Sequence, residues 1–540
     1  MDDPQGYLAV VLHAHLPYVR HPEHDDFLEE RWFFEAMTET YLPLLRVLEG
    51  LEDDGVPYRL LLSLSPTLVA MMEDPLLRER YRRHLDRLLA LIDRELDRTR
   101  EDGRLHQLAR WYRTFVRDTI HWFDDRCDGR IALAFARLAS LGRLELMTSA
   151  ATHGFLPLLR EDPGAVRAQV LTGCDAFAAA FGVRPTGMWL PECAYYPGLE
   201  DVLREAGLRF FLLDTHGIEH AEARPPHGVY APVCTPAGVA AFARDPESSK
   251  AVWSAEEGYP GHPLYREFYR DLGFEASEEH LGPLLVDGRI RVDTGIKYNR
   301  ITGAEEKDLY DPHAAREQAR THAADFLHRR REQIERLAGG MDRPPIAVAP
   351  YDAELFGHWW FEGPWFLDAL FRQREAIAPG LAPETPAGYL QRHPTNVAAT
   401  PSASSWGADG HYEFWIGDEN KWIYPLLHDA ARRFRPVLVR TLDAPADSLP
   451  DRALRQAARE LLLAQGSDWP FILRTGTSPS YATERMRTHL DRFERLLAML
   501  ADDTVDERTL AALEELDRIF PALDPARFLD PVPATSGRDD

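Results

Sequence analysis

The sequence predicts an α/β fold, a parallel barrel built on seven short apolar runs with two helical regions attached. The apolar runs alternate with longer helical stretches, which is the pattern of a parallel sheet covered by helices. Polar residues follow most of the runs, and two long segments break the alternation. At 540 residues the chain is also too long for one ordinary compact core, which fits a large barrel with additions.

The expected strands are the apolar runs at 7–12, 58–64, 143–147, 185–189, 209–213, 239–243 and 346–349. Run 289–292 is an eighth candidate that could equally belong to an insertion. A (β/α) barrel builds its active site at the carboxyl ends of its strands. The first candidates for a site are therefore the polar residues that follow the runs, among them His13, His153, Glu192, Asp214, Arg244 and Asp352.

Two segments are expected to be helical. In 71–127, Leu85, Leu88 and Ile92 recur at helical spacing opposite arginine and aspartate. From about residue 401 the pattern is again amphipathic. The expected organisation is a barrel over 1–70 and 128–400, an inserted helical subdomain over 71–127, a C-terminal helical domain over 401–530 that completes the substrate cleft, and a flexible tail over 531–540.

Charge and composition exclude several classes of function. A formal net charge of -25 argues against nucleic acid or an acidic membrane as a partner. The N-terminal run has no basic region before it and ends at His13, so we expect a cytoplasmic protein. The four cysteines show no C-x-x-C spacing, so neither a zinc site nor a disulfide framework is expected. No cofactor is expected, and the oligomeric state stays open.

The stretch HAHLPY places His13 and His15 two residues apart where a strand ends, so both rings can project to one side. Three interpretations are open for this pair. The rings could hydrogen-bond substrate hydroxyls or orient a neighbouring group, they could hold a metal ion, or they could be structural. The local sequence offers no third ligand of known spacing, which weakens the metal interpretation.

The stretch WLPECAYYPGLE sets Glu192 between Trp189 and a pair of tyrosines. A carboxylate among aromatic rings is partly desolvated, which raises its pKa or makes it a reactive nucleophile. The structural alternative is that Glu192 caps the helix that follows.

The stretch APYDAELFGHWWFEGP (349–364) holds a second acid, Asp352, at the end of the last run. Glu354 is a weaker candidate. Two carboxylates at nearby strand ends are what glycoside cleavage and transfer need, one as general acid and one as nucleophile or base. Trp359 and Trp360 are candidate walls of a cleft, and His358 is expected to contact substrate or orient a carboxylate.

Aromatic residues in loops form a further cluster. In SSWGADGHYEFWIGDENKW (404–422), Trp406 and Trp415 are expected to stack on sugar rings. Asp468 and Trp469 are expected to add a polar and aromatic contact. Segment 258–271 is either a loop over the cleft or a partner surface, and 227–238 could be a mobile lid.

Five ordered motifs resemble glycoside hydrolase family 57, and within it the 1,4-α-glucan branching enzymes. They are HAHLPYVRHPE, TSAATHGFLP, WLPECAYYPGLE, PYDAELFGHWWFEGP and SSWGADGHYEFWIGDENKW, and they span nearly the whole chain. The resemblance implies an incomplete (β/α)7 barrel with an inserted helical subdomain and a C-terminal all-helical domain. It also implies a retaining mechanism without metal that moves an α-1,4-glucan chain to a 6-hydroxyl.

The resemblance also implies residue roles. Glu192 matches the family's nucleophile and Asp352 its general acid/base. The positions that match residues lining the family's glucan cleft are His13, Trp32, His153, Trp406 and Trp415. Tyr230 lies in the region of a loop tyrosine that supports branching in the family.

Other functions remain open at this point. An α-amylase or 4-α-glucanotransferase of the same family would share both carboxylates, because the chemistry up to the covalent intermediate is the same. His13 and His15 leave room for a metal-dependent carbohydrate deacetylase or mannosidase. A glucan-binding protein without catalysis is a third alternative.

Overall fold

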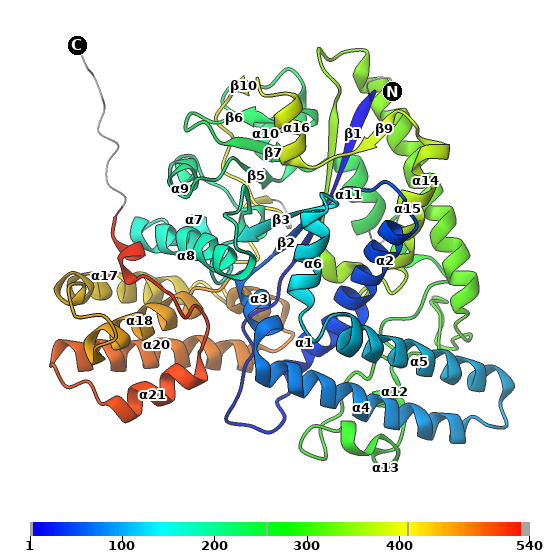
Figure 1. The fold of residues 1–540 in the computed structure, drawn as a ribbon, viewed down its shortest axis with the longest axis horizontal. Helices are drawn as coiled ribbons and strands as arrows, with labels where there is room; N and C mark the ends of the chain where they lie inside the picture. The colour runs from blue at the N-terminus through cyan, green and yellow to red at the C-terminus, as the bar shows by residue number, and fades with distance from the viewer. Residues whose placement is uncertain (1–3, 255–256, 408–409, 531–540) are drawn as a thin grey trace. The chain divides into compact units, whose positions relative to one another are not determined.

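Ten strands form one sheet in the computed structural model, which describes residues 4–254, 257–407 and 410–530 (Figure 1). The strand order is β10-β6-β7-β5-β4-β3-β2-β1-β8, with β9 paired to β1. The order has two ends, so within the described residues the barrel is incomplete. The strands are β1 (Gly6–Ala14), β2 (Leu60–Leu64), β3 (Leu144–Ser149), β4 (Gly187–Trp189), β5 (Phe210–Leu213), β6 (Val233–Cys234), β7 (Ala240–Ala243), β8 (Ile346–Asp352), β9 (Leu381–Pro383) and β10 (Val397–Ala398).

All seven predicted strands are confirmed, as β1 to β5, β7 and β8. The short strands β6, β9 and β10 lack a recognisable run and were not predicted. Run 289–292 is not a strand, and its only pairing among the described residues is an isolated bridge between Val286 and Ile290. All nine residues of β1 are buried, as expected for a parallel strand covered on both faces.

The chain folds into two compact units. Unit 1 is made of Met1–Leu62, Met71–Leu146 and Arg244–Pro394, and unit 2 of Ser63–Ala70, Met147–Ala243 and Thr395–Asp540. The division falls inside β2 and β3. Each unit therefore holds its own part of the sheet with its own helices, and each carries its own set of candidate site residues.

The helices of unit 1 include the predicted helical insertion. Stretch 71–127 is helical as predicted, in α4 (Pro75–Arg98), α5 (Gly103–His121) and a π-helical turn (Trp122–Arg126). The remaining long helices are α1 (Glu30–Ala36), α2 (Leu42–Asp53), α6 (Ile131–Ser140), α11 (Pro246–Trp253), α14 (Pro312–Ala338), α15 (Gly363–Ile377) and α16 (Pro386–Arg392).

An aspartate followed by proline starts several of these helices. Asp74, Asp245 and Asp311 each accept hydrogen bonds from backbone N–H groups of the first turn of α4, α11 and α14. The proline that follows has a preset φ and no N–H to leave unpaired. This local signal explains where the helices begin.

Unit 2 contains the C-terminal helices. The amphipathic pattern after residue 401 is confirmed as α17 (Ile423–Thr441), α18 (Leu449–Ala464), α20 (Pro479–Ala501) and α21 (Glu507–Leu516). Helices α18 and α20 pack on α17, and α21 packs on α18 (Figure 1). The other helices are α8 (Pro163–Phe181), α9 (Leu199–Glu205), α10 (Thr215–Glu219) and α19 (Asp468–Thr475), with the short α7 (Leu156–Leu159); α3 (Pro66–Glu73) crosses the division. The predicted tail 531–540 lies outside the described residues.

None of the helices in the described part of the chain has both the length and the apolarity that a membrane crossing needs.

A buried ionic cluster joins the C-terminal helices. His489 on α20 is fully buried, and its Nδ1 lies 2.7 Å from a carboxylate oxygen of Glu460 on α18. Arg485 lies 3.0 Å from the other ring nitrogen, and Arg492 pairs with the buried Asp517 at 2.5 Å. Because a buried charge needs a partner, these contacts stabilise the packing of α18 against α20.

Replacing His489 with alanine should destabilise the C-terminal helices by roughly 3 kcal/mol, because Glu460 then loses its partner on α20 and keeps only the amide of Gln456 on its own helix. Calorimetric melting of the full chain measures this as a fall in melting temperature. Asp418→Asn is the control, since Asp418 and its partner Lys421 are both exposed, and it should leave the melting temperature unchanged. Equal effects of the two changes would contradict the structural role of the cluster.

Candidate active site

Glu192 has an unusual backbone conformation in unit 2. It follows β4 in a single 3₁₀ turn, with φ 62° and ψ 24°, and Cys193 also has a positive φ of 50°. Residues other than glycine rarely adopt this left-handed region, and each one costs on the order of 1 kcal/mol or more. Two in succession indicate that the turn is held by its surroundings to direct the side chain of Glu192.

Both carboxylate oxygens of Glu192 accept a hydrogen bond from a neutral donor. The Ser467 hydroxyl donates to Oε1 over 3.1 Å, and the Trp406 indole N–H donates to Oε2 over 2.8 Å. Bonds of this kind favour the ionised form of a carboxylate. The Glu192 side chain stays 15% exposed, so it is accessible while being held.

His153 belongs to the same group. Its Nδ1 lies 2.9 Å from the Ser467 hydroxyl and 3.6 Å from Oε1 of Glu192. The backbone of His153 also has a positive φ, 57°, and its carbonyl accepts the N–H of Ser467. Two predicted residues, His153 and Glu192, are thus brought together by Ser467, which sequence reasoning missed although it neighbours the predicted Asp468.

Backbone pairing fixes the loop that carries Trp406. The Trp406 N–H donates to the carbonyl of Glu192, and Ser404 and Tyr195 form an antiparallel bridge next to it. The Trp406 ring also meets Trp189 edge-on, with ring centroids 5.0 Å apart. Trp406 therefore contacts Glu192 twice: its main-chain N–H binds the Glu192 carbonyl, and its indole N–H binds the carboxylate.

Two tryptophans that the sequence predicts to contact ligand pack inside unit 2 instead. Trp415 is 2% exposed and stacks on Phe155 with centroids 4.9 Å apart. Trp469 is also 2% exposed and donates its indole N–H to the carbonyl of Leu463. Burial of both rings corrects the expectation that they offer a face to a sugar.

The other predicted residues of unit 2 have varied positions. Asp214 follows β5 and caps α10 by accepting the N–H of Thr215, which is a structural use of its carboxylate. Asp468 is the half-buried first residue of α19. Tyr230 is half-buried in a 3₁₀ turn before β6, within the segment that the sequence offers as a lid.

In unit 1, His13 and Asp352 are paired residues on adjacent strands. They are opposite each other at the ends of β1 and β8 in parallel register. His13 is 2% exposed, and its burial together with the neighbouring His15 ring holds the pKa of His13 well below its usual value. His13 is therefore neutral and able to donate or accept a hydrogen bond beside Asp352.

Glu354 supports this end of the sheet. Its carboxylate accepts the hydroxyl of Tyr41 and the backbone N–H of His15. Burial raises the pKa of Glu354. The His13 and His15 rings are stacked with centroids 5.8 Å apart, as their spacing predicts. Glu354 thus ties three chain segments together.

A π-helical turn, Met37–Tyr41, anchors the turn that follows Asp352. Besides the bond from Tyr41 to Glu354, the Thr40 hydroxyl accepts the N–H of His358 at 3.2 Å. Gly357 passes so close that a Cβ added to it would lie 2.0 Å from the carbonyl oxygen of Glu39. Its φ of 134° is also one that other residues avoid. Single π-helical turns are common at functional sites, and this one positions the segment that follows Asp352.

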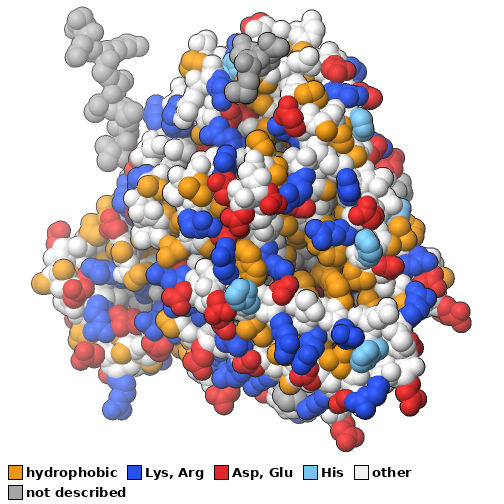
Figure 2. Space-filling model, turned by 45° about the vertical axis from the view of Figure 1, so that its right-hand side comes forward, with side chains coloured by type: hydrophobic (Ala, Val, Ile, Leu, Met, Phe, Trp, Pro, Cys, Tyr) orange, Lys and Arg blue, Asp and Glu red, His pale blue; other side chains and the backbone are white. Residues whose placement is uncertain are grey.

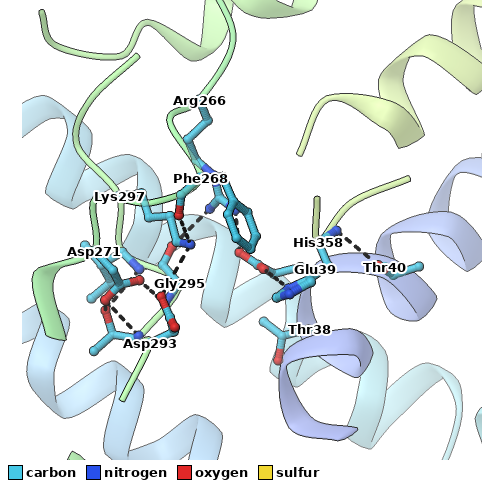
Figure 3. Close-up of polar contacts among 12 residues, drawn as sticks. Thr38, Glu39, Thr40, Arg266, Phe268, Asp271, Asp293, Gly295, Lys297 and His358 are labelled. Atoms are coloured by element: carbon cyan, nitrogen blue, oxygen red, sulfur yellow. Dashed lines mark hydrogen bonds and ion pairs between the residues drawn. The ribbon is translucent and has the colours of Figure 1, made fainter. Parts of the chain in front are cut away.

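Glu39 is the buried charge at the centre of this region (Figure 3). Its carboxylate binds Arg266 over 2.6 Å and His358 over 3.0 Å. Burial alone would raise the pKa of Glu39, but Arg266 and His358 outweigh it and hold the pKa at about 2. Glu39 in turn raises the pKa of His358, although burial opposes this. His358 therefore orients a carboxylate, one of its two predicted roles.

Loop 258–271 belongs to this cluster in unit 1. Arg266 of this loop forms the ion pair with Glu39, and Phe268 stacks on Trp359 with ring centroids 4.3 Å apart. Trp359 is 54% exposed and offers a face, whereas the adjacent Trp360 is 1% exposed and packs on Phe366. The expectation that both tryptophans form a wall is thus corrected for Trp360.

Glu35 is a half-buried acid of unit 1 that sequence reasoning missed. Burial raises the pKa of Glu35 to about 8, against the opposing charge of His358. Asp293 and Glu39 lie near enough to add to the rise. Glu35 and Glu39 follow Trp32, a predicted residue that is half-buried on α1. Arg244, also predicted, is half-buried in unit 1.

Among the described residues, only one group of three metal-ligand side chains lies close enough to share an ion. It is the buried trio of Glu460, His489 and Asp517. Arg485 and Arg492 both pair with Asp517, so the group fits a structural network better than a cation site.

Each unit thus presents an acid suited to one half of a displacement reaction. In unit 2 an accessible carboxylate is held by neutral donors and can act as a nucleophile. In unit 1 an acid at a strand end lies beside a neutral histidine and can exchange protons.

Sequence profiles of known families match the chain in two places. Residues 9–396 match Glycosyl hydrolase family 57, and residues 426–528 match a domain described as 1,4-alpha-glucan branching enzyme, C-terminal. The second match runs from the first turn of α17 through α18, α19, α20 and α21.

Individual proteins are similar over nearly the whole chain. A structure described as a novel alpha-amylase from Thermotoga maritima is 41% identical, with a TM-score of 0.91 over 98% of this chain and 99% of that one. A branching enzyme of this family from Pyrococcus horikoshii is 33% identical, with a TM-score of 0.87 over 98% of both chains. A 1,4-alpha-glucan branching enzyme from Thermococcus kodakarensis is 33% identical over 96% of this chain and 77% of its own length.

Gly357→Ala should destabilise unit 1, because the new Cβ would collide with the backbone of Glu39. Gly55→Ala is a matched control: Gly55 also has a positive φ, 67°, but has open space around it. It isolates the backbone cost, about 1 kcal/mol. The melting temperature should fall clearly further for Gly357→Ala, and equal falls would contradict the close approach.

Glu35→Gln should make the chain less sensitive to alkaline pH. In the wild type, unfolding releases the Glu35 proton at any pH between the ordinary pKa of the unfolded chain and about 8 in the folded chain. Stability is therefore lost as pH rises through this window, and glutamine removes that loss. The difference in melting temperature, variant minus wild type, should increase by a few degrees between pH 5 and pH 8. Above pH 8 this difference should stay constant. Glu335→Gln, which changes an exposed carboxylate on α14, should show no such trend.

Proposed function

Because the chain belongs to glycosyl hydrolase family 57, we propose that it is a 1,4-α-glucan branching enzyme. It cleaves an α-1,4 link of a glucan and transfers the freed chain to a 6-hydroxyl of another chain, as in glycogen synthesis. The observation that carries this proposal is the match of 426–528 to a branching-enzyme domain. The two carboxylates do not distinguish a branching enzyme from an amylase, because an amylase of this family would need the same pair.

In the proposed mechanism Glu192 is the nucleophile. It attacks the anomeric carbon, and the leaving oxygen departs as a hydroxyl with a proton from Asp352. Donation from Ser467 and Trp406 supports this role, because it keeps Glu192 ionised and fixes its direction.

In the second step Asp352 acts as a base. It takes the proton of the incoming 6-hydroxyl, whose oxygen displaces Glu192, so the configuration is retained. Its place beside the neutral His13 supports this role, since His13 can hydrogen-bond the sugar without adding charge. Trp359 and Trp406 are the proposed aromatic contacts to glucan, and His15, Trp32, Tyr230 and Arg244 remain proposed substrate contacts.

The competing function is an α-amylase, which differs only in what intercepts the covalent glucan. The 41% identity to the Thermotoga maritima protein, which is described as an alpha-amylase, is the reason to test it. A metal-dependent deacetylase or mannosidase is not favoured, because the relatives belong to family 57. A cytoplasmic location stays a prediction.

Incubation with amylose decides between transfer and hydrolysis. We expect many new α-1,6 links, counted after debranching, and few new reducing ends. Many reducing ends with few α-1,6 links would make the protein an amylase and would overturn the proposal.

Two substitutions test the proposed roles. Glu192→Gln should reduce transfer by on the order of 10⁴-fold or more, through loss of the nucleophile. Asp352→Asn should reduce it by about 10²–10⁴-fold. With α-maltosyl fluoride, whose leaving group needs no proton, only Asp352→Asn should still release fluoride.

The control is Glu205→Gln, a matched change at a partly exposed carboxylate on α9 that pairs with Arg167. It should leave transfer unchanged. Retained transfer in Glu192→Gln or Asp352→Asn would remove that residue from the mechanism.

A further inference from the structure

Unit 1 contains a polar and aromatic cavity that is not lined by any of its candidate catalytic residues. A cavity of about 860 Å³ opens among α2, α5, α14 and α15. A smaller one of about 420 Å³ shares Trp111, Arg316 and Trp365 with it, so the two form one groove. His13, Asp352 and Glu354 are absent from the lining of both.

Aromatic rings form a wall of this groove. Trp111 on α5 stacks on Phe115 with centroids 5.7 Å apart and meets Phe361 edge-on at 5.8 Å. Phe361 in turn meets Trp365 at 5.9 Å. The two tryptophans and Phe115 are only half-buried. In Figure 2, where the side of unit 1 with α14 and α15 is turned forward, hydrophobic side chains gather in a hollow bordered by charged ones. Grouped, partly exposed rings of this kind mark a binding surface.

The charges around the groove balance. Five arginines (Arg46, Arg104, Arg316, Arg320 and Arg372) line it together with five acids (Glu39, Asp118, Asp311, Glu317 and Asp368). Some are paired with each other, as Arg46 is with Asp118 at 3.0 Å. A balanced lining favours an uncharged ligand over a nucleotide or a phosphorylated molecule, which would need an excess of positive charge.

Polar groups in the groove are free to bind that ligand. Arg316, Glu317 and Arg320 are exposed on α14, and none of them forms an ion pair with any other described residue. The indole N–H groups of Trp111 and Trp365 likewise have no hydrogen-bond partner within the described ranges. The groove thus offers donors, an acceptor and ring faces together.

We propose that this groove is a second α-glucan-binding site, separate from the residues that carry out the reaction. Its ligand is identified by chemistry: an uncharged chain with apolar ring faces to stack on tryptophan and with hydroxyl groups that both donate and accept. That the chain is an α-1,4-glucan rests on the proposed function.

The groove serves the reaction by holding a polymer. A long glucan bound there keeps its other segments near the same protein molecule, which raises their effective concentration at the catalytic residues. A short oligosaccharide gains nothing from this, because it occupies one site at a time. Affinity for polysaccharide should therefore depend on the groove more than affinity for maltoheptaose.

Affinity electrophoresis in native gels with glycogen tests the proposal. The double variant Trp111→Ala/Trp365→Ala should bind glycogen at least about tenfold more weakly. A loss of this size is expected when a polymer that occupies two linked sites can occupy only one. Trp253→Ala is the matched control, since Trp253 is 39% exposed in unit 1 and does not line the groove. Unchanged retardation of the double variant, or an equal loss in Trp253→Ala, would overturn the proposal.

Hydroxyl-radical footprinting of the wild type removes any dependence on how the variants fold. Glycogen should protect Trp111 and Trp365 from oxidation. Absence of protection would overturn the proposal, as would protection that appears without glycogen and grows with protein concentration, because a second copy of the chain would then cover the groove. Protection with no α-1,6 links formed from amylose would overturn the proposed function and leave the groove standing.

Discussion

The buried carboxylate of Glu39 is the interaction on which the candidate site in unit 1 depends. A charge in the protein interior must be paired, and Glu39 is paired on two sides by Arg266 and His358. Arg266 brings in loop 258–271, and His358 fixes the turn after Asp352. The neighbouring Thr40 and Tyr41 bind the same turn. The position of Asp352 is thus set by β8 before it and by this pairing after it.

Unit 2 holds its acid by a different means. Glu192 and His153 both have backbones in the left-handed region, and this cost has to be offset by surrounding contacts. Ser467 contacts both residues, and Trp406 contacts Glu192 through its main chain and its ring. The strained turn presents the carboxylate, while neutral donors stabilise its charge without neutralising it. An attacking carboxylate needs this combination, since a salt bridge would weaken it as a nucleophile.

The groove of α2, α5, α14 and α15 also combines polar and aromatic contacts, but there the polar groups are charged. Its charges cancel and its tryptophans are partly exposed, which suits a sugar chain and not an anion. A branching enzyme benefits more than an amylase from holding two polymer segments, because both donor and acceptor are glucan. The groove and the C-terminal domain are therefore both relevant to whether the cleaved chain is transferred to another glucan or released by water.

The sequence by itself determined seven of the ten strands and the polar residues that follow them. These are local properties: an apolar run of the right length forms a buried strand, and the chain order then places His13, Glu192 and Asp352 at strand ends. Asp-Pro pairs likewise mark helix starts. The five motifs, read as a resemblance, implied the family.

Only the tertiary structure decided which side chains the site uses. Trp359 and Trp360 are adjacent in sequence, yet one is 54% exposed and the other 1%. Trp415 and Trp469 are buried while Trp406 contacts Glu192. A loop has no periodicity to show which ring turns inward. Ser467 and Glu39 could not be found either, because their partners lie hundreds of residues away and come together only when the chain packs.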